Sequence, residues 1–258
     1  DLKLSDIVRM LTRGLGATNE QEITIIEGWS VDEIGTYLEK EGMGTKREFF
    51  EIVGDMQRPS LRSDGGLASS FDFVFLNDKP ASVGLEGYLF PDTYRVRKNA
   101  QPEEIVRVML ENFDKKLTEE MRQDIAQQGK TIFDIVRMAS IVEAEVPHEQ
   151  DRPVIAGILW KRLDAGMALQ VDSTLNYAIG GKNRALSADE LRIESLYNSY
   201  KYRGLPPTPI GNPGLSAIRA AIYSKHTAYW YFLSGKDSKT YFAKTLEEHN
   251  ENKAKYLK

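Results

Sequence analysis

The feature that most constrains the fold of this chain is an apolar run from Ile132 to Glu145 with the period of an α-helix. At about 100° per residue, one stripe of this predicted helix is apolar except for a carboxylate near its end: Ile132, Ile135, Val136, Ala139, Val142 and Glu143. Glu145 is expected on the polar side, and Val146–Pro147 ends the helix. A helix that stops at a buried acid is expected to open onto a cleft.

Glu143 therefore occupies a position where the pattern requires an apolar side chain. Burying an unpaired ionised carboxylate costs several kcal/mol, so such a group tends to hold a proton near neutral pH. A general acid needs this property. The alternative interpretation is a structural carboxylate at the edge of the core, paired with an arginine or capping a neighbouring helix.

Charge and composition restrict the partners. The 258 residues include 41% hydrophobic and 28% charged residues, which is typical of a soluble globular chain with one large core or two domains. The net charge is −4, and the 34 basic residues form no block, so neither nucleic acid nor an anionic membrane surface is an expected partner. We expect neutral or weakly charged ligands.

The chain has no cysteine, which excludes disulfides, thiolate metal sites and a cysteine nucleophile. Its three histidines, His148, His226 and His249, are far apart and lack ligand spacing, so neither a metal site nor another cofactor is expected. No run is long enough to cross a bilayer, and no signal peptide is recognisable. Because the chain begins with Asp1, we interpret it as a trimmed or mature fragment whose natural form can still carry an anchor.

The order of the expected elements favours an α+β fold with two parts. Residues 1–80 read as a small unit with a short helix at 4–11, a strand at 23–26 and helices opened by capping boxes at Ser30–Glu33 and Thr45–Glu48. The stretch 58–80 is rich in Pro, Ser, Gly and Asp, so we place a boundary near residue 80.

Residues 81–258 read as a larger domain in which helices outnumber strands. Helices are expected from Pro102, over 132–145, from Pro153 to Gly166, from the capping box Ser187–Glu190, over 215–222 and from Thr245. A hairpin is expected between them, with strands Tyr229–Leu233 and Thr240–Ala243.

Three segments contain polar, aromatic, Gly or Pro residues in patterns that core packing alone does not require. Leu85–Tyr94 combines Glu86 with aromatic residues around Gly and Pro, which suits a sugar because its C–H faces stack on rings while its hydroxyls seek carboxylates. The alternative for this segment is a strand and turn at the edge of the core, with its tyrosines half-buried. Leu169–Tyr177 offers Gln170 as a ligand, while Asp172 fits the N-cap of a short helix. Tyr197–Gly214 is a Pro- and Gly-rich loop that either lines a groove or serves as a stiff connector.

Four motifs in register, Leu85–Tyr94, Ala139–Glu143, Tyr197–Tyr200 and Gly204–Gly214, resemble the endolytic murein transglycosylase family (MltG, YceG-like) over nearly the whole chain. Glu27–Ser30 and its helix resemble the LysM-like subdomain of that family. One departure is Lys239–Phe242, because many relatives have a His before that Phe.

The resemblance implies cleavage of the glycan strands of peptidoglycan between N-acetylmuramic acid and N-acetylglucosamine, with Glu143 as the catalytic acid and a 1,6-anhydro product. It also implies an extracytoplasmic domain held at the cell membrane by a single N-terminal helix upstream of Asp1, with peptidoglycan synthases as partners.

The predicted chemistry needs one acid that acts twice, and no second acid is evident on the Glu143 stripe. Glu86 is the best candidate for an electrostatic carboxylate. The residues expected to hold the sugar are Tyr88, Gln170, Tyr197, Asn198 and Asn212.

Other functions remain open from the sequence. A peptidoglycan-binding protein would need the aromatic loops but no raised pKa at Glu143, and a hydrolytic muramidase would use Glu86, Asp92 or Asp172 to position water. The label aminodeoxychorismate lyase, sometimes applied to this family, would require a pyridoxal phosphate site. No Gly-rich phosphate loop precedes a helix in this sequence.

Overall fold

The computed structural model of the chain describes residues 19–54, 71–146, 148–181 and 185–257. Helices predominate in this part of the chain, and its strands form two separate two-stranded antiparallel sheets, β1–β2 and β3–β4. The predicted α+β class is therefore confirmed. The predicted helix at 4–11 and residues 58–70 of the Pro- and Gly-rich stretch lie outside the described residues.

The elements follow one another in this order: β1 (Glu20–Thr24), α2 (Val31–Lys40), α3 (Lys46–Val53), η2 (Val74–Leu76), β2 (Thr93–Arg97), α4 (Pro102–Lys116), α5 (Glu119–Gln127), α6 (Ile132–Glu145), η3 (Glu149–Asp151), α7 (Arg152–Asp164), α8 (Asp172–Ala178), η4 (Glu190–Arg192), α9 (Leu215–Ile222), β3 (Tyr231–Ser234), β4 (Thr240–Ala243) and α10 (Leu246–Tyr256). None of the described helices is long and apolar enough to cross a membrane.

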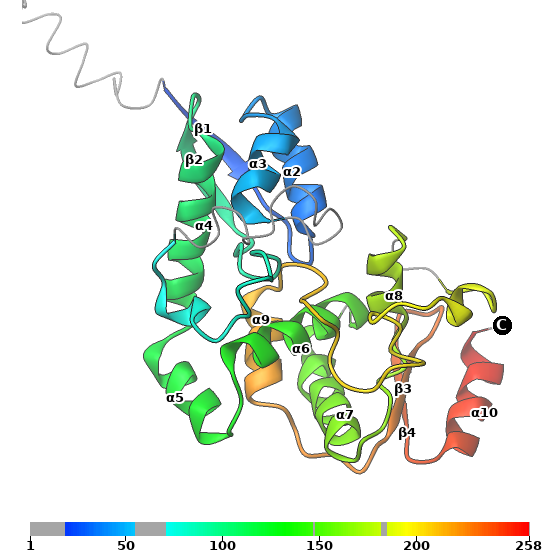
Figure 1. Cartoon of the computed structure of the whole chain (residues 1–258). Helices are drawn as coiled ribbons and strands as arrows, with labels where there is room; N and C mark the ends of the chain where they lie inside the picture. Colours follow the sequence, from blue (N-terminus) through cyan, green and yellow to red (C-terminus); the bar gives the residue numbers. More distant parts are fainter. Residues whose placement is uncertain (1–18, 55–70, 147, 182–184, 258) are drawn as a thin grey trace, which may run out of the picture.

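β1, α2 and α3 form a strand–helix–helix unit, drawn in blue in Figure 1. Both helices begin at the predicted capping boxes. The Ser30 and Thr45 hydroxyls accept from the backbone N–H three residues on, and the Glu33 and Glu48 carboxylates accept from the cap N–H in return. The apolar faces of both helices are buried, so this unit packs as part of the main core.

β2 pairs antiparallel with β1 and places Tyr94 opposite Ile23. The sequence offered a strand in this region only as an alternative for Leu85–Tyr94, and β2 overlaps the end of that segment. β2 lies beyond residue 80, so this sheet joins the two sides of the predicted domain boundary. The described residues on both sides also share one hydrophobic core. The division into residues 1–80 and 81–258 stays a prediction.

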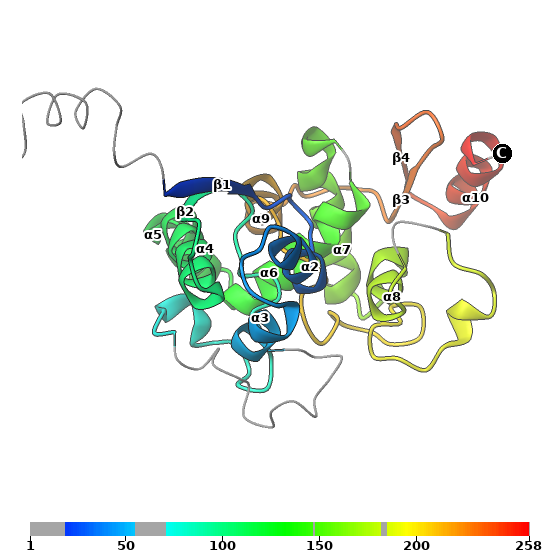
Figure 2. The same cartoon turned by 90° about the horizontal axis from the view of Figure 1, so that it is seen from above.

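α6 lies in the middle of the larger part, where α6, α7 and α9 pack against one another (Figures 1 and 2). Its bounds are those predicted, and Thr131 and Asp134 form the capping box that begins it. Most residues from Phe133 to Val142, except Asp134 and Arg137, are buried on several sides of the helix, which explains why the apolar run is broader than a single stripe. In α7, Gly157 has no Cβ to collide with the backbone carbonyl of Lys225, so that segment packs directly on the helix.

The hairpin β3–β4 and α10 occupy the C-terminal edge (Figure 1). β3 begins at Tyr231, two residues later than predicted, and α10 begins after Thr245, its N-cap, as predicted. The predicted helix from the Ser187 capping box is wrong, because only the single 3-10 turn η4 follows. The Asn198 side-chain amide donates to the Leu191 and Ile193 carbonyls at 3.0 and 2.9 Å, and this pins the chain in an irregular loop after that turn.

Candidate active site

A cleft of about 930 Å³ lies between the β1–α2–α3 unit and the α6–α8 side of the larger part. Its walls come from the loop between β1 and α2, the first turns of α2 and α3, the end of α6 and one face of α8. Acidic and aromatic side chains gather in it: Glu27, Trp29, Phe50, Glu86, Glu143 and Tyr177.

Glu143 lies in the last turn of α6 and lines this cleft, as the helical spacing predicted. Its side chain is only 7% exposed. The Arg152 guanidinium, at the start of α7, donates to Oε1 in a buried ion pair, and the Gly214 backbone N–H donates to Oε2 at 3.0 Å. Glu143 thus lies at a cleft, as predicted, and it also has the arginine partner that the alternative interpretation proposed.

Opposing effects set the pKa of Glu143. Burial is the largest and raises it, whereas the Arg152 charge and the Gly214 N–H lower it, and the nearby Glu27 and Glu149 charges raise it. The net result is a pKa above the ordinary value of a glutamate. A carboxyl group in this environment retains its proton to higher pH than usual, which suits proton donation into the cleft.

The loop between β1 and α2 is fixed over Glu143. The Gly28 N–H donates to the Asn212 carbonyl, and the Asn212 N–H donates to the Trp29 carbonyl, both at 2.8 Å. Gly28 has φ +80°, and a Cβ on it would lie 3.4 Å from Cγ of Glu143. The Gly28 carbonyl packs against the Gly211 backbone, which is possible because Gly211 has no Cβ: a Cβ there would lie only 2.5 Å from that oxygen. The unit with β1, α2 and α3 thus packs directly on the acid.

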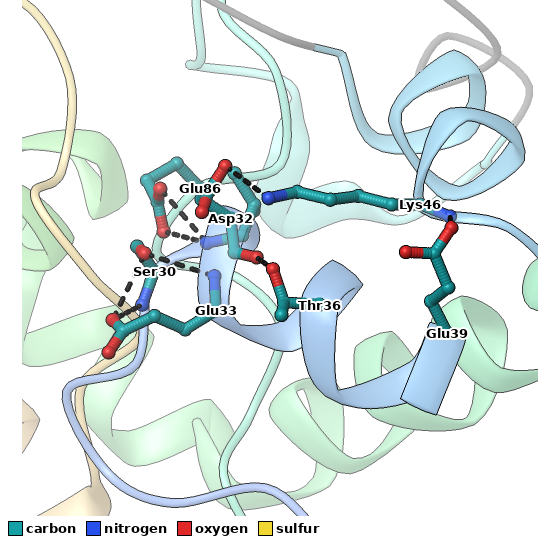
Figure 3. A network of polar contacts seen from close by, with 8 residues as sticks. Ser30, Asp32, Glu33, Thr36, Glu39, Lys46 and Glu86 are labelled. Atoms are coloured by element: carbon teal, nitrogen blue, oxygen red, sulfur yellow. Dashed lines mark hydrogen bonds and ion pairs between the residues drawn. The ribbon is translucent and has the colours of Figure 1, made fainter. Parts of the chain in front are cut away.

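Glu86 is the second buried acid of the cleft, only 4% exposed. Its carboxyl oxygens accept from the Val31 N–H at the start of α2 (3.1 and 3.2 Å), from the Tyr177 hydroxyl (3.0 Å) and from the Asn212 amide (3.0 Å). Figure 3 shows it against the first turn of α2. Burial outweighs these donors and raises the pKa of Glu86 to about 8, so the carboxyl is mostly protonated at neutral pH. This protonation conflicts with the electrostatic role predicted for Glu86.

Asn212 holds the two sides of the cleft together. Its amide donates to the Trp29 carbonyl at 2.8 Å as well as to Glu86, and its side-chain oxygen accepts from the Leu89 N–H at 2.9 Å. Asn212 is fully buried, so it positions the cleft walls and has no free group to offer a sugar.

Tyr197 lies behind the cleft rather than in it. Its ring packs on that of Tyr177 with centroids 5.5 Å apart, and its hydroxyl is 2.7 Å from that of Thr208. Tyr177, on α8, is the member of this pair that lines the cleft. Tyr197 therefore supports Tyr177.

Three predicted sugar-binding residues lie away from the cleft. Tyr88 is fully buried among Phe75 and Phe113, because the aromatic rings of this segment fill the core. Asn198 is fully buried and pins its own loop, as described above. Gln170, which has φ 55°, is exposed and accepts from Arg162 at 2.7 Å. In this conformation none of the three faces the cleft.

Three other acids differ from the sequence expectations. Glu145 does not face solvent: it is half-buried, accepts from the Ser173 N–H at 3.1 Å, and has a pKa raised by burial. Asp172 does not cap α8, because its carboxylate accepts from the Tyr200 hydroxyl at 2.5 Å instead. Asp92 accepts from Asn112 outside the cleft.

Sequence reasoning missed Arg152, Glu27 and the aromatic wall formed by Trp29 and Phe50. Arg152 is a basic residue at the beginning of a helix, where no local pattern signals an ion pair with an acid nine residues earlier. The one available signal was the Glu27–Ser30 motif, whose Trp offers a ring suited to a sugar face. No group of three or more potential metal ligands occurs within the described residues.

The arrangement supports proton transfer to an uncharged ligand. Glu143 has a raised pKa at the bottom of a cleft whose walls carry the rings of Trp29, Phe50 and Tyr177. Rings of this kind bind the apolar faces of extended, neutral molecules such as sugars.

Comparisons with known proteins agree along the whole chain. A model of the YceG-like family matches residues 1–255. The endolytic murein transglycosylase of Bacillus subtilis strain 168 is 33% identical over 261 residues, which cover 99% of this chain and 70% of the relative. That of Streptococcus pneumoniae strain D39 is 30% identical over 286 residues, and the chain spans 99% of its own length but 49% of the relative. The crystal structure of a yceG-like protein from Listeria monocytogenes superposes with a TM-score of 0.77 at 31% identity, covering 96% of this chain and 80% of that one.

Proposed function

Because this chain belongs to the YceG-like family, we propose that it is an endolytic murein transglycosylase, a lyase that cuts the glycan strands of peptidoglycan. The observation that carries the proposal is the position of Glu143, a buried acid of raised pKa in a cleft with aromatic walls. The names of the relatives from Bacillus and Streptococcus support the same activity.

In the proposed reaction Glu143 gives its proton to the oxygen between N-acetylmuramic acid and N-acetylglucosamine. The bond from C1 to that oxygen breaks, and its electron pair stays on the oxygen, which leaves as a hydroxyl. The C6 oxygen of the same muramic acid then attacks C1, and its proton passes to the Glu143 carboxylate. The product is a 1,6-anhydro end, no water is consumed, and Glu143 is again protonated. Attack within one sugar gains from proximity.

The ion pair with Arg152 fits this double role. As an acid Glu143 needs burial, which raises its pKa, and as a base it needs a partner for its negative charge. Arg152 and the Gly214 N–H provide that partner for the carboxylate formed after the first proton transfer.

The test compares the wild type with Glu143→Gln on purified peptidoglycan, with mass spectrometry of the released muropeptides. We expect anhydro ends from the wild type and none from the variant. Reducing ends would indicate hydrolysis, and binding without release would indicate a peptidoglycan-binding protein. Loss of long strands before short products accumulate would distinguish internal from terminal cutting.

We further propose that the unit containing α2 and α3 is LysM-like and contributes to holding the strand. Its Trp29 and Phe50 in the cleft wall support this role. Binding of isolated, uncleaved glycan strands by Glu143→Gln, with and without Trp29→Ala, tests it.

We also propose the cellular setting implied by the family: an extracytoplasmic domain anchored in the cell membrane by an N-terminal helix upstream of Asp1, beside peptidoglycan synthases. Expression of the natural gene product, followed by membrane fractionation and protease accessibility, tests the location. Cross-linking in cells tests the partners.

A further inference from the structure

Five carboxylates line the cleft: Glu27, Asp32, Glu33, Glu86 and Glu143. All of them except Glu27 form hydrogen bonds or ion pairs with described residues. Asp32 pairs with Lys46 at 2.7 Å, and Glu33 caps its own helix through Ser30 (Figure 3). Glu86 accepts from Val31, Tyr177 and Asn212, and Glu143 pairs with Arg152. Glu27 is the exception, because its carboxylate has no hydrogen bond or ion pair with any described residue.

Glu27 is placed beside the catalytic acid by Gly214. A Cβ at Gly214 would collide with the Glu27 carboxylate, so that side chain lies directly against the Gly214 backbone. The N–H of the same glycine donates to Glu143 at 3.0 Å. The two carboxyl groups thus meet at one residue, and the Glu27 charge is close enough to raise the pKa of Glu143.

The backbone that carries Glu27 is held in place. Gly28, the next residue, is hydrogen-bonded to the Asn212 carbonyl, and Trp29 to the Asn212 N–H, both at 2.8 Å. The Glu27 side chain is exposed toward the cleft on this fixed loop. A carboxylate that is carried on a fixed loop and has no hydrogen-bond partner among the described residues is available to a ligand.

We propose that Glu27 is the second carboxylate of the active site and stabilises the positive charge that develops at the anomeric carbon when the glycosidic bond breaks. This inference rests on the proposed function. Glu27 forms no covalent bond and transfers no proton: the leaving oxygen takes the proton of Glu143, the muramic C6 oxygen closes the ring, and the negative charge of Glu27 faces the cationic transition state.

The assignment replaces Glu86 in this role. The Glu86 carboxyl accepts from three different groups and is buried, so it has neither a free oxygen nor an exposed face. Glu27 comes from the β1–α2 loop, so the reaction would use carboxyl groups from both sides of the cleft.

The test measures kcat and KM on soluble glycan strands for the wild type, Glu27→Gln and Glu22→Gln, together with their pH profiles. Glu22 is a matched control because it lies on β1, exposed and paired with Arg95 outside the cleft. We expect Glu27→Gln to lower kcat by about 10²–10³-fold, as for loss of one preorganised electrostatic group, with KM changed by less than about threefold. The limb on which activity falls with rising pH should also move to lower pH, because the Glu27 charge that raises the pKa of Glu143 is gone.

Activity of Glu27→Gln within about threefold of Glu22→Gln overturns the inference. So does a fall in kcat with an unchanged pH limb and a lowered melting temperature, since that is the signature of a structural role. If Glu27→Gln does not fold, Glu27→Asp keeps the charge, and it should retain most of the kcat and the pH limb of the wild type. A wild type that releases no anhydro ends would instead refute the proposed function, which separates the two failures.

Discussion

Arg152→Met removes the charged partner of Glu143 while keeping an apolar side chain in its place. Arg152 is only 5% exposed. Its Nη2 donates to Glu143, whereas its Nε and Nη1 have no hydrogen-bond acceptor among the described residues. Glu143 would be left buried with only the Gly214 N–H. Its carboxyl group should respond by holding its proton to higher pH.

The size of the change follows from the geometry. The two paired side chains are 6% and 7% exposed, so solvent screens them little. Two unit charges about 4 Å apart at an effective dielectric constant of about 20 attract by about 4 kcal/mol, which corresponds to a pKa change of at most about 3. A rise of about 1–3 is therefore expected for the pKa of Glu143.

The assay is kcat/KM against pH on soluble glycan strands, where the falling limb reports the protonated acid of the free enzyme. The limb should move up by about 1–3 pH units in Arg152→Met, while Arg152→Lys should stay closer to the wild type. Arg122→Met is the matched control, because it breaks another arginine–carboxylate pair, with Asp114 at 2.8 Å, outside the cleft.

The same variant has a stability signature. With a folded pKa raised further above its unfolded value, Glu143 contributes stability that is complete below the unfolded pKa and is lost as pH rises through the folded pKa. As pH rises from the unfolded pKa of Glu143 to its folded pKa, the free energy of unfolding of Arg152→Met should therefore fall by about 1–4 kcal/mol more than that of the wild type. Urea denaturation at a series of pH values measures this difference. A falling limb that stays in place or moves down would refute the reasoning.

Three further predictions concern the cleft walls. Burial raises the pKa of Glu86 from 4.5 to about 8. The protonated Glu86 carboxyl therefore makes its full contribution to stability below pH 4.5, and this contribution decreases as the pH rises to about 8. The excess stability of wild type over Glu86→Gln should fall by roughly 3–5 kcal/mol across that range in urea denaturation. Asn212→Ala should cost about 2–5 kcal/mol by the same method, because it leaves the buried Leu89 N–H without its acceptor. Trp29→Ala should raise KM about tenfold in the glycan assay with little change in kcat, since Trp29 lies in the wall and packs on Tyr37.

The sequence predicted most helices well because their signals are local. Capping boxes at Ser30 and Thr45 each begin a helix where expected, and α6, predicted from its apolar run, has the predicted bounds. The Ser187 box forms its hydrogen bonds too, yet the Asn198 side chain, a few residues further along, occupies the carbonyls that a helix would use. The bounds of β2 were not predicted, and a strand there was only an alternative for Leu85–Tyr94, since its strand character depends on pairing with β1 across many intervening residues.

For the candidate site, too, the features set by local sequence were predicted and those set by tertiary contacts were not. Helical periodicity alone placed Glu143 at a cleft, because burial at the end of an apolar stripe is a local property. Residue type alone did not distinguish the residues that face the cleft from those that stabilise the fold. The Asn198 and Asn212 amides donate to backbone carbonyls, and the ring of Tyr88 lies in the core. The partners that tune the acid, Arg152 and Gly214, are close in space only after folding, so no spacing in the sequence reveals them.

The environment of Glu143 is assembled from segments that the sequence assigned to different domains. Gly28, before α2, packs against its side chain, and Gly214, before α9, donates to its carboxylate. Asn212 links these two segments through backbone hydrogen bonds in both directions. Under the proposed function, a glycan strand bound to the wall of the β1–α2–α3 unit would lie in register with the acid, because Asn212 links that unit to the segment that contacts Glu143. Binding energy gained along the wall would then orient the sugar at Glu143.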